Sequence, residues 1–151
     1  MRCYEYHHIV GFEETNLVGN VYYANHIRWQ GRCREMFLRD EAPDVLTELN
    51  LGLCLVTTRV SCEYYLELFA FDHVIIRMRA GKITQNRVTM LYDYLRANRI
   101  GGKHEPELIA HGQQQIAAMR KENGVMVASP FPEAMQKALD RYAAMDAAAV
   151  Y

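Results

Sequence analysis

The stretch from Gly11 to Arg39 constrains the fold more than any other part of the chain. A polar segment, Phe12 to Asn20, leads into a helical pattern that begins at Val21. At ~100° per residue, the polar side chains of this pattern gather on one narrow face. They are Asn25, Arg28, Arg32, Glu35 and Arg39. The rest of the circumference is largely apolar, which predicts a helix that is buried on several sides.

One charged residue interrupts the apolar arc of this helix. The arc carries Tyr22, Tyr23, Ile27, Trp29, Cys33, Phe37 and Leu38. Arg34 projects between Tyr23 and Ile27 within it. Because burying a lone guanidinium is costly, Arg34 needs either a partner or an anionic ligand. The pattern leaves two interpretations open: a structural arginine that snorkels or pairs with a core carboxylate, and a functional one.

The remaining segments predict an antiparallel sheet. Strands are expected at Cys3–Val10, Cys54–Leu68, Val74–Ala80, Val88–Leu95 and Leu108–Met119, the last of which would also suit a helix. A short helix is expected at Asp40–Asn50, a turn at Thr84–Asn86, a hairpin-like connection at Asn98–Gly102, and a terminal helix at Glu133–Met145. This order predicts an α+β fold, with about five strands wrapped around one long central helix. We expect a single domain over residues 1–151, whose open sheet edge favours dimerisation.

Charge and motif content exclude several classes of function. Seventeen basic and eighteen acidic side chains give a net charge of −1, which does not favour nucleic acid or an anionic membrane. No membrane-spanning run or signal peptide is visible, so we expect a cytoplasmic protein. The spacing of the four cysteines and six histidines matches no metal motif, and no nucleophile or dinucleotide motif is present. We therefore expect neither a metal nor a cofactor.

The junction between the polar loop and the helix is the remaining place for chemistry. The first N–H groups of a helix lack internal partners, so they can hold a carbonyl oxygen as negative charge develops on it. The amides of Val21, Tyr22 and Tyr23 would supply this oxyanion site, and Gly19 would let the backbone approach closely. Asn16 can donate and accept hydrogen bonds just upstream. The plainer alternative is that Asn16 is an ordinary turn or capping residue.

The same stretch carries a family resemblance. The segment T-N-L-V-G-N-V-Y-Y-A-N-H-I-R-W-Q-G-R-C-R-E resembles the signature of hotdog-fold acyl thioesterases of the 4-hydroxybenzoyl-CoA type, roughly D-x-x-G-x-V-(Y/F)-(Y/H)-x-x-Y-x-x-W before a long helix. Together with C-E-Y-Y-x-E-L-F-A-F-D further on, it is most similar to the thioesterases of enediyne polyketide biosynthesis. Asn16 stands where the wider family commonly has a catalytic Asp, and an amide cannot act as nucleophile or base.

The resemblance implies a hotdog fold and a thioesterase that relies on Asn16 and Arg34. Its substrate would be a polyene chain with a β-keto or β-hydroxy group, released from an acyl carrier protein, with loss of carbon dioxide as a following step. The family also implies a homo-oligomer, a dimer or a dimer of dimers. Glu63 and Tyr65 are secondary candidates for the site, although Glu63 also reads as a surface or interface carboxylate. Arg77 and Arg79 could meet the carrier protein, but an exposed strand face is the simpler account.

Three alternatives and one geometric problem remain. The chain could be a general acyl-CoA thioesterase or a non-catalytic acyl-binding partner of a polyketide synthase. A third alternative, a dehydratase, would want a His or an acidic pair in the site, and we expect neither there from the key segment. The problem is that Tyr23 and Arg34 are eleven residues apart, or ~16 Å of helix. Either the loop runs back along the helix toward Arg34, or the two groups meet across a dimer interface.

Overall fold

The computed structural model describes residues 2–97 and 106–144. Its elements, in chain order, are β1 (Tyr4–Ile9), the 3-10 turn η1 (Phe12–Glu14), α1 (Ala24–Glu41), α2 (Pro43–Leu49), β2 (Leu53–Tyr64), β3 (His73–Ala80), β4 (Arg87–Ala97), β5 (Glu107–Glu122), β6 (Val125–Ala128) and α3 (Glu133–Arg141). The predicted connection at Asn98–Gly102 lies outside the described residues, as does the end of the predicted terminal helix.

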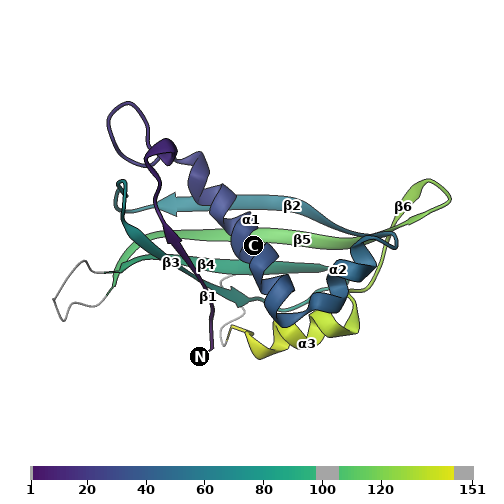
Figure 1. Ribbon diagram of the computed structural model, residues 1–151. Helices are drawn as coiled ribbons and strands as arrows, with labels where there is room; N and C mark the ends of the chain where they lie inside the picture. Colours follow the sequence, from purple (N-terminus) through teal and green to yellow (C-terminus); the bar gives the residue numbers. More distant parts are fainter. Residues whose placement is uncertain (1, 98–105, 145–151) are drawn as a thin grey trace.

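The strands form one antiparallel sheet in the order β1-β3-β4-β5-β2, and β6 pairs with the end of β5. The long helix α1 lies across one face of this sheet, while α2 and α3 pack near its C-terminal end (Figure 1). The predicted α+β class and the sheet around a long central helix are confirmed. Strand β6 was not predicted, although Asn123 and Gly124 both have positive φ and form the two-residue Asn-Gly turn typical of a hairpin.

Helix α1 begins at Ala24, three residues later than the pattern predicts. The residues before it are held in another conformation, because the N–H of Val21 donates to Leu68 O and the N–H of Tyr22 donates to Glu14 O. The side chains of Tyr22 and Tyr23 are consequently exposed, and their predicted place in the buried arc is wrong.

The core side of α1 is otherwise as predicted. Trp29, Cys33, Phe37 and Leu38 are all buried in the main apolar cluster. Asn25 was expected on the solvated face but is also buried. Its side-chain amide donates to Glu14 O at 2.8 Å, so a specific acceptor compensates for the loss of water.

Strand β2 departs from the predicted alternation in two ways. It ends at Tyr64 rather than Leu68, and its register against β5 shifts between Thr57 and Arg59. Such a bulge inserts one residue and moves the following side chains to the other face. As a result, Thr57 lies on the helix side of the sheet, where it contacts α1, although the alternation had placed it opposite Val60.

Strand β2 is also an edge of the sheet. Within the described residues it pairs only with β5, which leaves its other side open. Val56 and Val60 on this strand are each 39% exposed. None of the described helices is long and apolar enough to cross a membrane.

Candidate active site

Asn16 lies in an exposed turn between η1 and α1. Its Oδ1 accepts a hydrogen bond from the N–H of Val18 at 3.0 Å, and its carbonyl oxygen accepts one from the N–H of Gly19 at 2.9 Å. Gly19 has φ of +93°, and nothing lies within 4 Å of the place where a side chain would begin. The glycine is therefore required by its left-handed backbone rather than by a close approach. The Asn16 side-chain NH₂ makes no hydrogen bond to another described residue.

The predicted oxyanion site needs a correction. The amides of Val21 and Tyr22 already donate to Leu68 O and Glu14 O, at 2.8 and 2.9 Å, so neither can hold a substrate oxygen in this conformation. The N–H of Tyr23, which precedes the first residue of α1, has no backbone acceptor within the described chain. Of the three predicted amides, Tyr23 alone can take this role.

Glu14 fixes the loop relative to its neighbours. Its carboxylate accepts hydrogen bonds from the N–H of Gly11 at 2.8 Å and from Trp29 Nε1 at 2.7 Å, and it lies 2.7 Å from His8 Nε2. Partial burial raises the pKa of Glu14, but the hydrogen bonds from Gly11, His8 and Trp29 outweigh it and hold the pKa below its ordinary value. One carboxylate thus ties β1, the loop and α1 together.

An open hollow of about 600 Å³ lies beside this Glu14 cluster, between α1 and β1. Charged side chains of both signs surround it: Glu13, Arg28, Arg32 and Glu35. Arg32 and Glu35 pair with each other at 3.2 Å. A rim of mixed sign favours no particular class of ligand.

Arg34 lies under α1, against the sheet. Its Nη1 donates to Gln114 Oε1 on β5 at 2.9 Å and to Thr57 Oγ1 on β2 at 3.1 Å. The side chain is half-buried, and within the described residues it has no carboxylate partner. One form of the structural interpretation, pairing with a core carboxylate, is therefore excluded among the described residues, because two neutral groups hold Arg34 instead. Its positive charge stays available to an anionic group.

The structure does not bring Asn16 and Arg34 together within one chain. The turn at Asn16 is held by a bridge between Thr15 and Val21 and by another between Asn20 and Phe69. These contacts keep the turn at the N-terminal end of α1, beyond the tip of the sheet (Figure 1). The loop does not run back along the helix, so the first of the two predicted geometries is excluded.

Glu63 and Tyr65 form a pair near the end of β2. The hydroxyl of Tyr65 donates to Glu63 Oε2 at 2.9 Å, and both side chains are exposed. The pKa of Tyr65 is raised, mainly by this hydrogen bond to Glu63. Neither side chain contacts Asn16 or Arg34 within the described chain. Arg77 and Arg79 pair with Glu5 and Asp93.

Two polar residues on the sheet-facing side of α1 were missed in the sequence. His26 and Gln30 precede Arg34 by eight and four residues, so the three share one stripe of the helix. Both are buried; Gln30 Nε2 donates to Ser61 O at 3.0 Å, whereas neither ring nitrogen of His26 has a hydrogen-bond partner within the described residues. The sequence did contain one signal for His26. The family segment has Tyr at this position, so the histidine departs from the family pattern.

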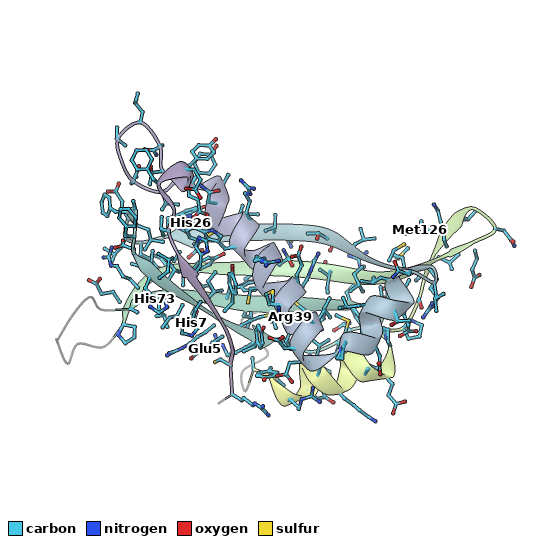
Figure 2. The ribbon with its side chains drawn as sticks, viewed as in Figure 1. Glu5, His7, His26, Arg39, His73 and Met126 are labelled. Carbon is cyan, nitrogen blue, oxygen red and sulfur yellow. The ribbon has the colours of Figure 1, made fainter. Side chains whose placement is uncertain are left out.

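His26 lies at the start of α1, next to the tip of the sheet (Figure 2). Its ring packs against three aromatic rings, those of Trp29, Tyr64 and Tyr94, with centroids 4.7 to 5.6 Å away. Burial lowers the pKa of His26 to about 4, although the nearby carbonyl of Tyr23 opposes this shift in part. The ring is therefore neutral at pH 7, with one N–H donor and one acceptor nitrogen.

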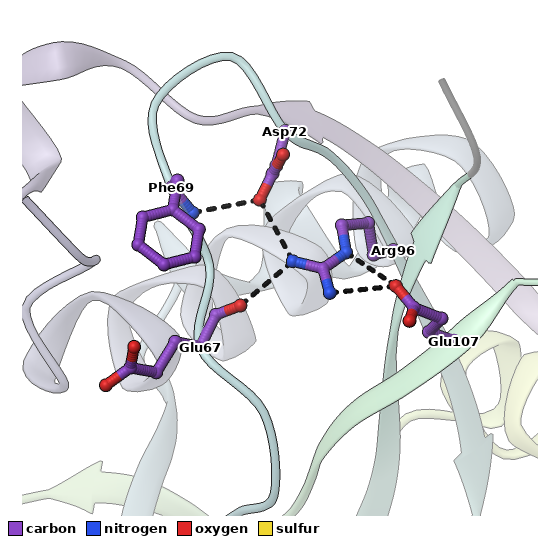
Figure 3. Close-up of polar contacts among 5 residues, drawn as sticks. All are labelled: Glu67, Phe69, Asp72, Arg96 and Glu107. Carbon is purple, nitrogen blue, oxygen red and sulfur yellow. Dashed lines mark hydrogen bonds and ion pairs between the residues drawn. The ribbon is translucent and has the colours of Figure 1, made fainter. Parts of the chain in front are cut away.

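The loop after β2 completes this end of the molecule, and a second ion-pair cluster anchors it (Figure 3). Arg96 on β4 donates to Glu67 O at 2.9 Å and to Asp72 Oδ2 at 3.3 Å, and it pairs with Glu107 on β5. Asp72 in turn accepts from the N–H of Phe69 at 2.9 Å. The backbone of this loop is thereby fixed beside the start of α1.

Metal ligands do not gather in the part of the chain that the structure describes. No group of three or more His, Cys, Asp or Glu side chains there could hold a metal ion. His7 and His73 lie side by side at 2.9 Å on β1 and β3 (Figure 2), but their ring nitrogens face each other and Glu5. The four cysteines are free, and burial raises the pKa of the Cys33 thiol far above its ordinary value.

Residues 10–139 match the model of the thioesterase-like superfamily. The dynemicin thioesterase, whose crystal structures reveal induced-fit and allosteric effects upon polyene binding, is 41% identical with a TM-score of 0.90, over 96% of this chain and 100% of that one. Comparison with curated protein sequences found no match.

More distant structures share the fold. A 1,4-dihydroxy-2-naphthoyl-CoA thioesterase from Synechocystis is 16% identical with a TM-score of 0.80, over 92% of this chain and 96% of that one. A 4-hydroxybenzoyl-CoA thioesterase is 13% identical with a TM-score of 0.78, over 92% and 99%. At these identities the likeness is one of fold alone.

Proposed function

This chain belongs to the thioesterase-like superfamily of hotdog-fold thioester hydrolases, and from that premise we propose that it releases a polyene acyl chain, with a β-keto or β-hydroxy group, from an acyl carrier protein in enediyne polyketide biosynthesis. The dynemicin thioesterase supports this choice, because it is 41% identical over nearly the whole chain and binds a polyene. On this proposal residues 1–151 act as one thioesterase domain in the cytoplasm, where the carrier protein is.

The observation that carries the proposal is the state of Arg34. A half-buried guanidinium that, among the described residues, only Gln114 and Thr57 hold can stabilise the negative charge that develops on a thioester oxygen. Electrostatic stabilisation of this kind is often the largest single contribution to catalysis. Since a thioester is already activated, positioning and charge stabilisation can suffice without a strong base.

The proposed reaction uses three groups. The N–H of Tyr23 polarises the thioester carbonyl, and Asn16 holds the attacking water through its side-chain amide. The water oxygen attacks the carbonyl carbon, Arg34 stabilises the oxyanion, and the carbon–sulfur bond then breaks. The thiol of the carrier's pantetheine arm leaves with a proton from the water, and a carboxylic acid is released. A β-keto acid can then lose carbon dioxide off the enzyme.

The site is shared between two subunits in this proposal. Within one chain Asn16 lies at the N-terminal end of α1, while Arg34 faces β2 and β5. Strand β2 is an open edge with exposed Val56 and Val60, which supports pairing with a second copy. Pairing at this edge would let the Asn16 turn of one protomer approach Arg34 of its partner. Glu63 and Tyr65, at the end of the same strand, would lie near that interface.

The test is incubation with a carrier protein loaded with a 3-hydroxy or 3-oxo polyene chain, followed by mass spectrometry of the carrier and the released acid. We expect loss of the acyl group from the carrier and accumulation of the free acid. A thioester that stays intact in the presence of the bound protein would instead indicate the non-catalytic acyl-binding partner. Faster turnover of a simple acyl-CoA than of the loaded carrier would favour the general thioesterase.

A further inference from the structure

A small cavity lies beside the start of α1. Its volume is about 210 Å³, and we call it the Asn20–His26 cavity. It is lined by Asn20, Val21, Tyr23, His26, Tyr64, Leu66, Glu67 and Leu68. It therefore adjoins Tyr23, whose N–H is the remaining candidate for the oxyanion site.

Three buried polar atoms in the lining residues of this cavity lack hydrogen-bond partners among the described residues. They are Asn20 Oδ1 and both ring nitrogens of His26. The orientation of the Asn20 amide is fixed, because its Nδ2 donates to Glu67 Oε1 at 3.1 Å and its oxygen must then face the other way. A buried polar atom without a hydrogen-bond partner is destabilising, so such a group indicates an absent ligand or water.

The chemistry of the orphaned atoms selects the ligand. Asn20 Oδ1 only accepts hydrogen bonds, whereas the neutral ring of His26 offers one N–H donor and one acceptor nitrogen. A ketone oxygen can accept from His26 but leaves Asn20 Oδ1 unpaired. A hydroxyl group both donates and accepts, so it can donate to Asn20 Oδ1 while it accepts from His26.

We propose that the Asn20–His26 cavity is a subsite for a hydroxyl group on the acyl chain, held by Asn20 Oδ1 and the ring of His26. This inference rests on the proposed function, which it narrows to a 3-hydroxyacyl thioester. The hydroxyl is placed on the third carbon because that carbon is two bonds from the carbonyl carbon, and the cavity adjoins the Tyr23 amide that would hold the carbonyl oxygen.

Access to His26 runs past Tyr64. The ring of Tyr64 packs edge-on against His26 with centroids 4.7 Å apart, and its hydroxyl donates to Tyr23 O at 2.8 Å. The Tyr64 side chain is 43% exposed, so its ring can swing toward solvent when its hydroxyl gives up the hydrogen bond to Tyr23 O. On this proposal, that movement opens the path from the cavity to the His26 ring.

The test is binding of stable analogues, in which an amide replaces the thioester of an acyl-pantetheine. Isothermal titration calorimetry compares the two 3-hydroxyacyl enantiomers, the 3-oxoacyl compound and the unsubstituted acyl compound, all of one chain length. We expect one 3-hydroxyacyl enantiomer to bind at least ~10-fold more tightly than the 3-oxo and unsubstituted analogues. Equal binding of all the analogues, or preference for the 3-oxo compound, would overturn the proposal.

Two variants test the residues independently. His26→Phe and Asn20→Leu should each reduce the preference to near unity, while affinity for the unsubstituted analogue changes little. His26→Gln keeps a donor and an acceptor and should retain part of the preference. His73→Phe, a histidine on β3 that pairs with His7, is the matched control and should keep all of it. Full preference in both His26→Phe and Asn20→Leu would refute the assignment.

Failure of the hydroxyl-subsite proposal can be told apart from failure of the proposed thioesterase function. Amide analogues bind without being hydrolysed, so the preference can be found in a protein that proves catalytically inactive, and hydrolysis can be found without the preference. If His26→Phe does not fold, the wild-type ligand series and Asn20→Leu still decide the question.

Discussion

Arg34 is the residue on which the proposed chemistry depends most. It is the one charge in the apolar arc of α1, and its hydrogen bonds go to neutral groups on β2 and β5. Because these groups are neutral, the charge of Arg34 is not compensated by a carboxylate among the described residues. Arg28 lies on the same helix, but its side chain is exposed and points away from the sheet toward the hollow beside β1. The two arginines therefore form a natural pair for comparison.

We expect Arg34→Ala and Asn16→Ala each to lower kcat/KM for a carrier-bound thioester by at least ~100-fold, roughly the effect of losing one oxyanion donor. Arg28→Ala is the control and should stay near the wild-type value. Steady-state release of free thiol measures all three, with circular dichroism to establish folding. Near-normal turnover in a folded Asn16→Ala protein would contradict the mechanism.

The buried ring of His26 predicts how the stability of the protein depends on pH. Its pKa falls from 6.5 to about 4 on folding because the ring is buried. Below pH 6.5 the unfolded chain therefore binds a proton that the folded chain does not, so stability falls as pH falls toward 4. We expect this one group to remove up to about 3 kcal/mol from the free energy of unfolding over that range.

Urea unfolding of the wild type and of His26→Phe at several pH values measures this effect. The variant lacks the titrating ring, so its stability should fall less steeply between pH 6.5 and 4. Parallel pH profiles for the two proteins would show that His26 does not titrate in this way.

Single residues were predictable where periodicity and burial agree. The odd position of Arg34 follows from a helical wheel, and Trp29, Cys33 and Phe37 are buried as the wheel predicts. The partners of Arg34 were not predictable, because Gln114 is 80 residues away and is brought near only by the pairing of β5 with β2. His26 was overlooked because a lone histidine carries no spacing signal; its replacement of the Tyr in the family segment was the one signal present.

Helix α1 and strand β5 approach closely where Gln30 crosses Gly112. A Cβ on Gly112 would lie 2.2 Å from Gln30 Nε2 and 3.2 Å from Ser61 O. Only glycine leaves room for the hydrogen bond from Gln30 to Ser61 O. Gly31, the next residue on the same helix, has nothing within 4 Å of its own Cβ position. The two glycines thus have opposite roles.

Gly112→Ala should destabilise the protein by about 1–3 kcal/mol, because Gln30 must move and leave buried polar groups unpaired. Gly31→Ala should instead stabilise it by up to about 1 kcal/mol, since alanine is the better helix former and meets no neighbour. Chemical denaturation compares both with the wild type. A Gly112→Ala protein as stable as Gly31→Ala would contradict this account of the packing.

The type of each helix and strand was predicted better than the residues at which it begins and ends. All five predicted strands and all three helices exist among the described residues. The start of α1 was placed too early because tertiary hydrogen bonds from Val21 and Tyr22 hold the chain outside the helix. The bulge near Thr57 leaves no mark in an otherwise regular alternation, so it could not be predicted.

At the scale of the whole molecule, the proposed site is incomplete in one chain. The Asn16 turn precedes the start of α1, whereas Arg34 lies in the second half of this helix, where it contacts Thr57 on the open edge strand β2. Exposed apolar side chains gather on the loops at the same end as the turn: Phe12, Leu17, Val18, Phe69 and Phe71. A patch of this kind on a folded protein indicates an interaction surface. Both features support a homodimer whose two sites are each built from two protomers.

Mixed dimers test this claim most directly. Asn16→Ala and Arg34→Ala chains carrying different affinity tags are co-expressed, and the heterodimer is purified through both tags before its thioesterase rate is measured. If each site takes Asn16 from one protomer and Arg34 from the other, one site of the heterodimer carries both changes and its second site carries neither. We predict that the heterodimer recovers about half of the wild-type rate, while each parent homodimer stays at least ~100-fold below it. A heterodimer as inactive as its parents would contradict the shared site.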